Sequence, residues 1–223
     1  MNLRDIKVIV GGYMSADGKI APANRVGRAF FKFMTPRHRR MLHKIRSRVD
    51  AIIVGVDTVI ADNPSLTVRE VKGRNPIRVV LDSSGRIPLD SKILETEDAP
   101  TIIAVAKNVL RKRVESLRRR DVEVFVSTRG KRVDVKELMN ELRDRGVRTV
   151  LVEGGGETRW SFFKENLVDE FFLWMMPYIW GGRDAPTMVD GEGFLKEEDA
   201  VRLKLKSMKI VGKVLILWFS VKR

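Results

Sequence analysis

The sequence predicts an α/β protein with a mainly parallel central sheet, flanked by helices and extended by an antiparallel hairpin at its C-terminal end. Short, nearly continuous apolar runs rich in β-branched residues recur along the first two thirds of the chain, as in strands buried on both faces. Helical patterns separate most of these runs, which favours right-handed β-α-β crossovers. The last third contains strand-like runs, with no helical pattern between the final two.

Six apolar runs are expected to be strands, because each is short and bounded by turn or charge signals. They are residues 7–10, 51–55, 77–81, 101–106, 122–126 and 149–152. Another strand is expected to begin near Asp169. Apolar and basic residues then alternate over 201–206, which predicts a strand with one polar face, and Gly212 marks a hairpin turn. No repeat, linker or low-complexity segment interrupts the chain, so we expect one domain over residues 1–223.

Three helices have recognisable start signals. The first follows Thr35 as N-cap, with a proline at its first helical position. The second is expected to begin at Asn108 as cap, in "NVLRKRVESLRRR". The third begins at Asp134 and stops at Gly146, with Glu137 in the position that closes a capping box.

The composition narrows the class of protein. The chain has 223 residues and no cysteine, which excludes disulfides and thiolate metal sites. The two histidines, His38 and His43, are five positions apart and do not share a helical face, so we expect no metal site. The N-terminal residues do not form a signal peptide, and no apolar run approaches the roughly 20 residues of a membrane span. We therefore expect a cytoplasmic protein that does not contact membranes.

The formal net charge of +14 permits two kinds of partner. Lysine and arginine release counterions on meeting nucleic-acid phosphates, but the basic runs lack the interleaved aromatic residues of a single-strand binding platform. A small anionic substrate accounts for part of the charge equally well. The absence of glutamine and the many lysine, arginine and glutamate residues are also typical of a thermophile.

The segment "GVDTVIADNPSLTVRE" follows the predicted strand 51–55 and is the first candidate site. Thr58 and Asp62 are four positions apart, so one helical turn presents both on the same face before an Asn-Pro pair ends it. Leu66 and Arg69 are then expected in an extended segment. The Asp62 carboxylate can accept hydrogen bonds from ribose hydroxyls or amino groups, and Arg69 can pair with a phosphate. A capped surface loop is the alternative, because Asp-Asn-Pro-Ser is ordinary turn chemistry.

Two further strand ends carry polar or glycine-rich segments. In "VLDSSGRIP", Ser83, Ser84 and Arg86 surround Gly85 and can hold a phosphate monoester such as the 2′-phosphate of NADP, or simply form a polar β-turn.

In "TVLVEGGGETRW", the glycines 154–156 let backbone N–H groups approach a ligand, and Glu157 is expected to begin a helix whose N-terminus favours pyrophosphate. Arginine at position 159 excludes a G-x-G-x-x-G fingerprint, so a tight turn remains the alternative. Because parallel strands end at one edge, these segments predict a single ligand cleft.

These segments together resemble a known family. "MSADGKIA", "GVDTVIADNPSLTVR", "NPIRVVLDSSGRIP", "LVEGGGETRWSFFKENLVDEFFLWMMP" and "GGRDAPTMVDGEGF" occur in order over nearly the whole chain and are similar to the archaeal 2,5-diamino-6-ribosylamino-4(3H)-pyrimidinone 5′-phosphate reductase. They also resemble the reductase half of the bacterial bifunctional riboflavin deaminase/reductase. The resemblance implies a single reductase domain with a dihydrofolate-reductase-like fold, a homodimer, and NADPH as hydride donor. It further implies reduction of the ribosylamino group to ribitylamino in riboflavin biosynthesis, by hydride transfer to C1′ of the ring-opened imine.

The resemblance also assigns site residues. Those expected to bind the cofactor are Thr58, Asp62, Ser83, Ser84, Gly85, Arg86, Gly154, Gly155, Gly156 and Glu157. Those expected to bind the phosphorylated substrate are Arg46, Asp62, Leu66, Arg69 and Glu153. Asp62 is the candidate catalytic residue, facing the reaction centre, and no metal is implied.

One segment departs from the family pattern. Residues 22–34 read "PANRVGRAFFKFM", which is longer than the family's segment and lacks its polar signature. Its three phenylalanines are expected to stack on a base, to form a lid or to make a dimer contact. Reductases of another pterin or pyrimidine, such as dihydrofolate, therefore stay open. A basic nucleic-acid-binding protein and a nucleotide-binding module without catalysis also remain alternatives.

The aromatic and methionine residues of 174–180 suit either a dimer interface or the core.

Overall fold

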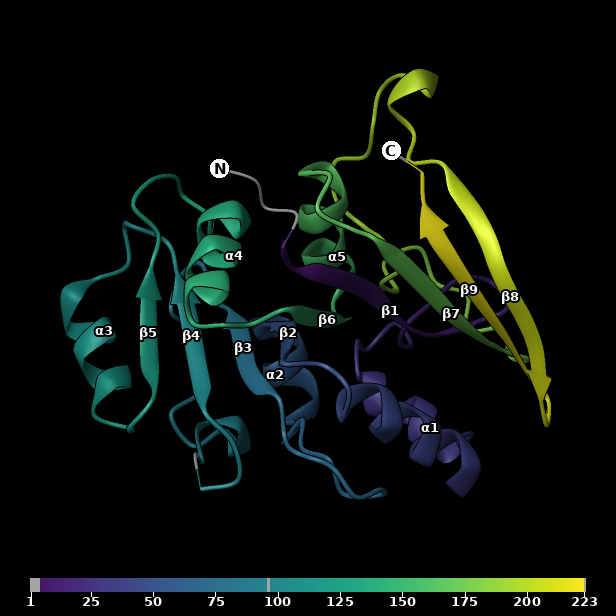
Figure 1. The fold of residues 1–223 in the computed structure, drawn as a ribbon, viewed down its shortest axis with the longest axis horizontal. Helices are drawn as coiled ribbons and strands as arrows, with labels where there is room; N and C mark the ends of the chain where they lie inside the picture. The colour runs from purple at the N-terminus through teal and green to yellow at the C-terminus, as the bar shows by residue number, and fades with distance from the viewer. Residues whose placement is uncertain (1–4, 96, 223) are drawn as a thin grey trace.

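A single sheet organises the chain (Figure 1). The computed structural model describes residues 5–95 and 97–222, and its nine strands lie in the order β5-β4-β3-β2-β6-β1-β7-β9-β8. In this spatial order, the strands β5, β4, β3, β2, β6, β1 and β7 run parallel to one another. Strand β9 pairs antiparallel with both β7 and β8. The strands are β1 (Lys7–Ser15), β2 (Ala51–Gly55), β3 (Ile77–Leu81), β4 (Thr101–Val105), β5 (Glu123–Val126), β6 (Thr149–Gly154), β7 (Glu170–Met176), β8 (Leu203–Val211) and β9 (Val214–Val221). This confirms the predicted α/β fold with its C-terminal antiparallel hairpin.

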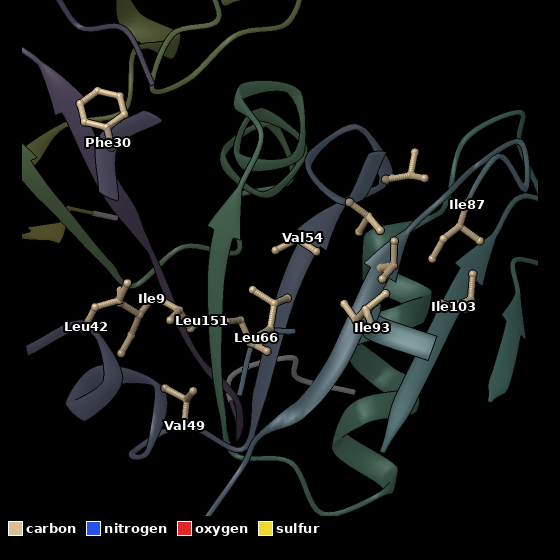
Figure 2. Close-up of a cluster of buried hydrophobic side chains, with 14 of the residues drawn as sticks. Ile9, Phe30, Leu42, Val49, Val54, Leu66, Ile87, Ile93, Ile103 and Leu151 are labelled. Carbon is tan, nitrogen blue, oxygen red and sulfur yellow. The ribbon is translucent and has the colours of Figure 1, made fainter. Parts of the chain in front are cut away.

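Helices cover both faces of the sheet. One apolar cluster contains buried residues of α1, α2 and α3, and the other contains those of α4 and α5. Figure 2 shows side chains of the first cluster, including Ile9, Phe30, Leu42, Leu66 and Leu151. The α-helices are α1 (Pro36–Arg46), α2 (Val56–Asp62), α3 (Arg111–Arg118), α4 (Val135–Asp144) and α5 (Gly156–Lys164), and the 3-10 helices are η2 (Gly27–Lys32), η3 (Lys92–Leu94) and η4 (Glu197–Asp199).

The first strand is longer than predicted. The sequence suggested residues 7–10, but β1 continues to Ser15 because β7 pairs with it from Ile9 onward, beyond the last pairing with β6. Gly11 and Gly12 therefore lie inside the strand and not in a turn after it. Strand β1 lies between β6 and β7. Its carboxyl end is therefore near the middle of the sheet.

The helix starts were predicted in part. Thr35 caps α1 as expected, and His38 closes the capping box, with its Nδ1 accepting from the Thr35 N–H at 3.2 Å. The predicted cap at Asn108 is wrong, because α3 begins at Arg111. Residues 106–109 instead form a turn in which the Val109 N–H donates to the Ala106 carbonyl at 3.2 Å.

The third predicted helix has its expected cap but not its capping box. The Asp134 carboxylate accepts from the backbone N–H groups of Lys136 and Glu137 at 2.9 and 3.1 Å. The Glu137 carboxylate accepts from the Thr128 N–H at 2.9 Å, so it anchors the loop after β5 and does not reach back to the cap.

The C-terminal hairpin turns between Val211 and Val214, as predicted from Gly212. Strand β8 was expected to have one polar face. Its side chains are exposed along most of its length, and it forms the free edge of the sheet. In β7, Trp174 and Met176 are buried at 1% and 0% exposure, so these two residues belong to the core. No helix in the described part of the chain is long and apolar enough to cross a membrane.

Candidate functional site

The predicted site residues gather around the carboxyl ends of adjacent strands β3, β2, β6 and β1. Helix α2 directly follows β2 and carries Thr58 and Asp62, while the glycine turn directly follows β6. These two segments touch, because a Cβ placed on Gly154 would lie 2.9 Å from the Thr58 Oγ1. The loop after β3 reaches the same helix through an ion pair between Arg86 and Asp57 at 2.8 Å. The strand-end segments therefore lie next to one another along one edge of the sheet.

Two predicted substrate residues bind each other. Arg46, at the end of α1, donates from Nε to the Glu153 Oε1 at 2.9 Å, and its Nη2 donates to the Oε2 of the same carboxylate. The side chains are 7% and 10% exposed. Burial acts to lower the pKa of Arg46, but the charge and hydrogen bonds of Glu153 outweigh it and raise that pKa. This forked pair fixes the orientation of both groups beside the end of β6.

Asp62 contacts the segment that departs from the family pattern. Its Oδ1 accepts from the Arg28 N–H at 3.0 Å, and a Cβ placed on Gly27 would lie 2.8 Å from its Oδ2. Burial raises the pKa of the Asp62 carboxyl, and the backbone N–H groups of Arg28 and Gly27 counteract this only in part. The candidate catalytic carboxyl thus also caps the start of η2.

The loop after α2 brings Leu66 and Arg69 to different environments. The extended segment predicted here is interrupted at Leu66, whose φ is 54° and whose side chain is 3% exposed in the core. Next to it, the buried Arg78 donates to the Ser65 carbonyl at 3.2 Å and holds the loop against β3. Arg69 is exposed, and its backbone N–H donates to the His43 Nδ1 at 3.0 Å.

The loop after β3 is a polar turn with two exposed side chains. The Asp82 carboxylate accepts from the backbone N–H groups of Arg86 and Ile87, both at 2.8 Å, which fixes the turn. The Ser83 hydroxyl accepts from the Val133 N–H at 3.0 Å and is therefore already used within the fold. Ser84 and the Arg86 guanidinium remain exposed, so these two can meet a phosphate group without breaking the turn.

The glycine turn is tightly packed on both sides. Helix α5 begins at Gly156, one residue earlier than predicted, with Gly155 as its cap at a φ of 80°. A Cβ on Gly156 would lie 2.1 Å from the Asp190 Oδ2, so only glycine permits this approach. Glu157 points elsewhere, forming an exposed ion pair with Arg132 at 3.2 Å. The backbone of the turn suits close contact with a ligand, while the neighbouring Asp190 carboxylate adds negative charge on the side of Gly156.

Arg159 is a buried residue of this region that the sequence interpretation missed. It is 3% exposed, and its guanidinium donates to the carbonyls of Gly11 and Met188, both at 3.2 Å, and to that of Glu153. Burial lowers its pKa to about 10. Arg159 thereby ties the middle of β1 to the end of β6, next to the glycine turn. Its position among the buried aromatic residues of α5 was the available signal, since a basic side chain there must find polar partners inside the protein.

No metal-binding cluster was found: within residues 5–95 and 97–222, no group of three or more His, Cys, Asp or Glu side chains is arranged to hold an ion.

Comparison with known proteins identifies the family. Residues 6–217 match the model of the RibD C-terminal domain. A protein of Aquifex aeolicus named 2,5-diamino-6-ribosylamino-4(3H)-pyrimidinone 5′-phosphate reductase is 40% identical over 215 residues, covering 96% of each chain. A protein of the same name from Methanothermobacter thermautotrophicus is 41% identical over 218 residues, covering 96% of this chain and 98% of its own.

Solved structures agree with the fold. RibD of Acinetobacter baumannii matches with a TM-score of 0.79 and 25% identity, covering 98% of this chain and 58% of that one. The dihydrofolate reductase of Enterococcus faecalis has a TM-score of 0.54 at 9% identity, covering 97% of both chains, which shows a common fold and nothing more. The fold is thus dihydrofolate-reductase-like, and this chain belongs to the RibD C-terminal domain family.

Proposed function

We propose that this chain is an NADPH-dependent reductase that converts the ribosylamino group of 2,5-diamino-6-ribosylamino-4(3H)-pyrimidinone 5′-phosphate to ribitylamino. The observation that carries the proposal is the edge of the sheet described above, on which the residues expected for two ligands lie side by side. The names of the two relatives at 40% and 41% identity support the same reaction. We also propose that the chain acts as one reductase domain.

The cofactor side of this edge fits a nicotinamide dinucleotide. A Cβ on Gly154 would lie 2.9 Å from the Thr58 Oγ1, so the glycine turn packs directly on α2, and the N-terminus of α5 that follows this turn favours a pyrophosphate. Ser84 and Arg86 are exposed at the end of β3 and suit the 2′-phosphate that distinguishes NADPH from NADH. When bound, NADPH supplies the hydride for the reduction. The Asp190 carboxylate lies against Gly156 and would repel a pyrophosphate there. The proposed pyrophosphate contacts are therefore to Gly154 and Gly155.

The substrate side is formed by Arg46, Asp62, Arg69 and Glu153. The exposed Arg69 guanidinium suits the substrate's 5′-phosphate, because its backbone is already held by His43. Arg46 fixes the Glu153 carboxylate to accept hydrogen bonds from the sugar or the pyrimidine amino groups. The half-buried Asp62 has a raised pKa, so it holds a proton more readily than an ordinary aspartate. Hydride transfer then depends mainly on positioning the two ligands.

We propose that the protein is a homodimer that uses the free edge of the sheet. Strand β8 exposes the side chains of Leu205, Met208 and Ile210 at 52%, 63% and 75%. The strand also carries Lys204, Lys206 and Lys209, but its backbone edge and these apolar side chains leave it able to pair with another strand. A second copy of β8 is the partner that best fits this edge.

The decisive experiment is an assay with purified protein, NADPH and the ribosylamino substrate, following the loss of cofactor absorbance. Dihydrofolate is offered in a parallel reaction, because the fold alone is shared with dihydrofolate reductase. We expect oxidation of NADPH with the ribosylamino substrate only. If neither compound is reduced, the reductase proposal fails. If dihydrofolate is the better substrate, the proposed substrate is wrong.

A further inference from the structure

Tyr13 lies beside the Arg46–Glu153 pair and was not assigned to the site by the sequence. Strands β1 and β6 are parallel, with Val10 opposite Val152, so Glu153 follows at the level of Gly11. Arg159 confirms this level, because its Nη2 donates to the carbonyls of both Gly11 and Glu153. Tyr13 is two residues further along β1. Side chains alternate along a strand, so Tyr13 and Glu153 face the same side of the sheet as diagonal neighbours.

The ring of Tyr13 is held by the segment 22–34. Its centroid lies 5.0 Å from that of Phe30 and 6.1 Å from that of Phe31, both in η2. Phe30 is completely buried, so it forms a rigid support for the ring. The start of η2 is in turn bonded to Asp62 through the Arg28 N–H. Tyr13 is therefore close enough to both carboxylates expected on the substrate side, Glu153 and Asp62, to interact with their charges.

The Tyr13 hydroxyl is available as a donor. Tyr13 is half-buried, and within the described part of the chain its hydroxyl makes no hydrogen bond. Burial raises the pKa of the phenol above its ordinary value, and the negative charge of Glu153 raises it further. The hydroxyl thus stays protonated throughout the physiological range. A hydroxyl without a partner on a half-buried side chain, beside a fixed ion pair, is suited to a polar ligand atom.

We propose that Tyr13 is a further substrate-contacting residue, whose hydroxyl donates a hydrogen bond to an oxygen of the substrate's sugar near Glu153 and Asp62. The inference rests on the proposed reductase function and deepens it. It gives the unusual segment 22–34 a role, because Phe30 and Phe31 set the position of the Tyr13 ring. Substrate recognition by this segment is then indirect.

The test replaces Tyr13 with phenylalanine, which removes the hydroxyl and keeps the ring on Phe30. The matched control is Tyr178→Phe, since Tyr178 is the only other tyrosine of the chain and packs on Phe33 at 4.0 Å. For Tyr13→Phe we expect kcat/KM for the substrate to fall about 3- to 12-fold, the loss of one hydrogen bond. The KM for NADPH and the thermal unfolding midpoint are expected to be unchanged. Tyr178→Phe is expected to match the wild type in every measurement.

Substrate binding to wild type and Tyr13→Phe is also measured by calorimetry, so that the two proposals can fail separately. Wild type that binds the substrate but does not reduce it overturns the reductase proposal, and the binding loss in Tyr13→Phe still tests Tyr13. Equal kcat/KM and equal binding in both proteins overturn the role of Tyr13 alone. Equal losses for substrate and NADPH also overturn it, because they indicate general damage to the site. Wild type that does not bind the substrate overturns both.

Discussion

The Glu153 carboxylate accepts two hydrogen bonds from the Arg46 guanidinium, although 107 positions separate the residues in the sequence. The pair joins α1 to β6 on the substrate side of the site. Both side chains are almost fully buried, so each charge depends on the other for its solvation.

Replacing Glu153 with alanine is expected to destabilise the protein by about 3–5 kcal/mol, because it leaves the Arg46 charge buried without a partner. The double variant Arg46→Met/Glu153→Met is expected to regain most of this loss, since it removes both charges. Urea unfolding of the two variants and the wild type measures the difference. A double variant as unstable as the single one would show that lost packing, and not the unpaired charge, is the cause.

Asp62→Asn is expected to reduce kcat by about 100-fold or more if the carboxyl transfers a proton. The asparagine Oδ1 can still accept from the Arg28 N–H, so the cap of η2 and the unfolding midpoint are expected to stay close to those of the wild type. Asp62→Ala removes the cap as well, and limited trypsin digestion at Arg25 or Arg28 is expected to become faster. Wild-type turnover in the asparagine variant would remove Asp62 from the chemistry.

His43 is expected to make stability depend on pH. Burial, and then the charges of Arg46 and Arg69, lower its pKa below the ordinary 6.5, and its unprotonated Nδ1 accepts from the Arg69 N–H. Below pH 6.5 the unfolded chain binds the proton first, so stability is complete above this value and falls as the pH drops toward the lowered pKa. His43→Asn keeps an acceptor near the Arg69 N–H but does not titrate. Urea unfolding from about pH 5 to 8 should show a shallower fall in this variant, and parallel curves would contradict the prediction.

Arg86→Ala is expected to raise the KM for NADPH about 10- to 100-fold and to leave the KM for NADH unchanged, because its exposed guanidinium is proposed to meet the 2′-phosphate. Its ion pair with Asp57 is solvent-exposed, so little stability should be lost. Arg111→Ala, which removes another exposed ion pair, is the control. Equal effects on both cofactors would exclude the contact with the 2′-phosphate.

Met208→Lys and Ile210→Lys are expected to convert the proposed dimer to a monomer, because they place charges on the free edge of the sheet. Sedimentation velocity over a range of protein concentrations measures the change. Lys204→Glu, on the same strand, tests whether charge reversal without loss of an apolar side chain has the same effect. A wild-type protein that sediments as a monomer at all concentrations would refute the dimer.

The sequence was informative where the signal is local. Buried strands, the cap at Thr35, the hairpin at Gly212 and the meeting of strand ends all follow from short patterns or from the rules of parallel sheets. The length of β1 was missed because it depends on β7, a partner far along the chain. The start of α3 was missed because a turn at Val109 took the place of the cap.

Within the site, the residue types were predicted but their partners were not. Sequence reasoning placed Arg46 and Glu153 near one ligand, yet it could not show that they pair, because such pairs depend on tertiary packing. Arg159 and Tyr13 were missed for a related reason. Tyr13 is brought to the site by the register of β1 and β6, and Arg159 by the backbone carbonyls that its buried guanidinium meets, neither of which a local pattern reveals.

The order of the sheet also has a consequence for how the protein is made. Among the described strands β1 is synthesised before the others, but both of its neighbours, β6 and β7, are encoded more than 130 residues later. During translation β1 therefore has no partner strand on either edge until β6 and β7 are synthesised. Strands β2 to β5 can already pair with one another before that point. A ribosome that stalls before β6 would leave this apolar strand without partners. Chaperone capture of the nascent chain is expected to concentrate on β1, and to end once β7 has left the exit tunnel.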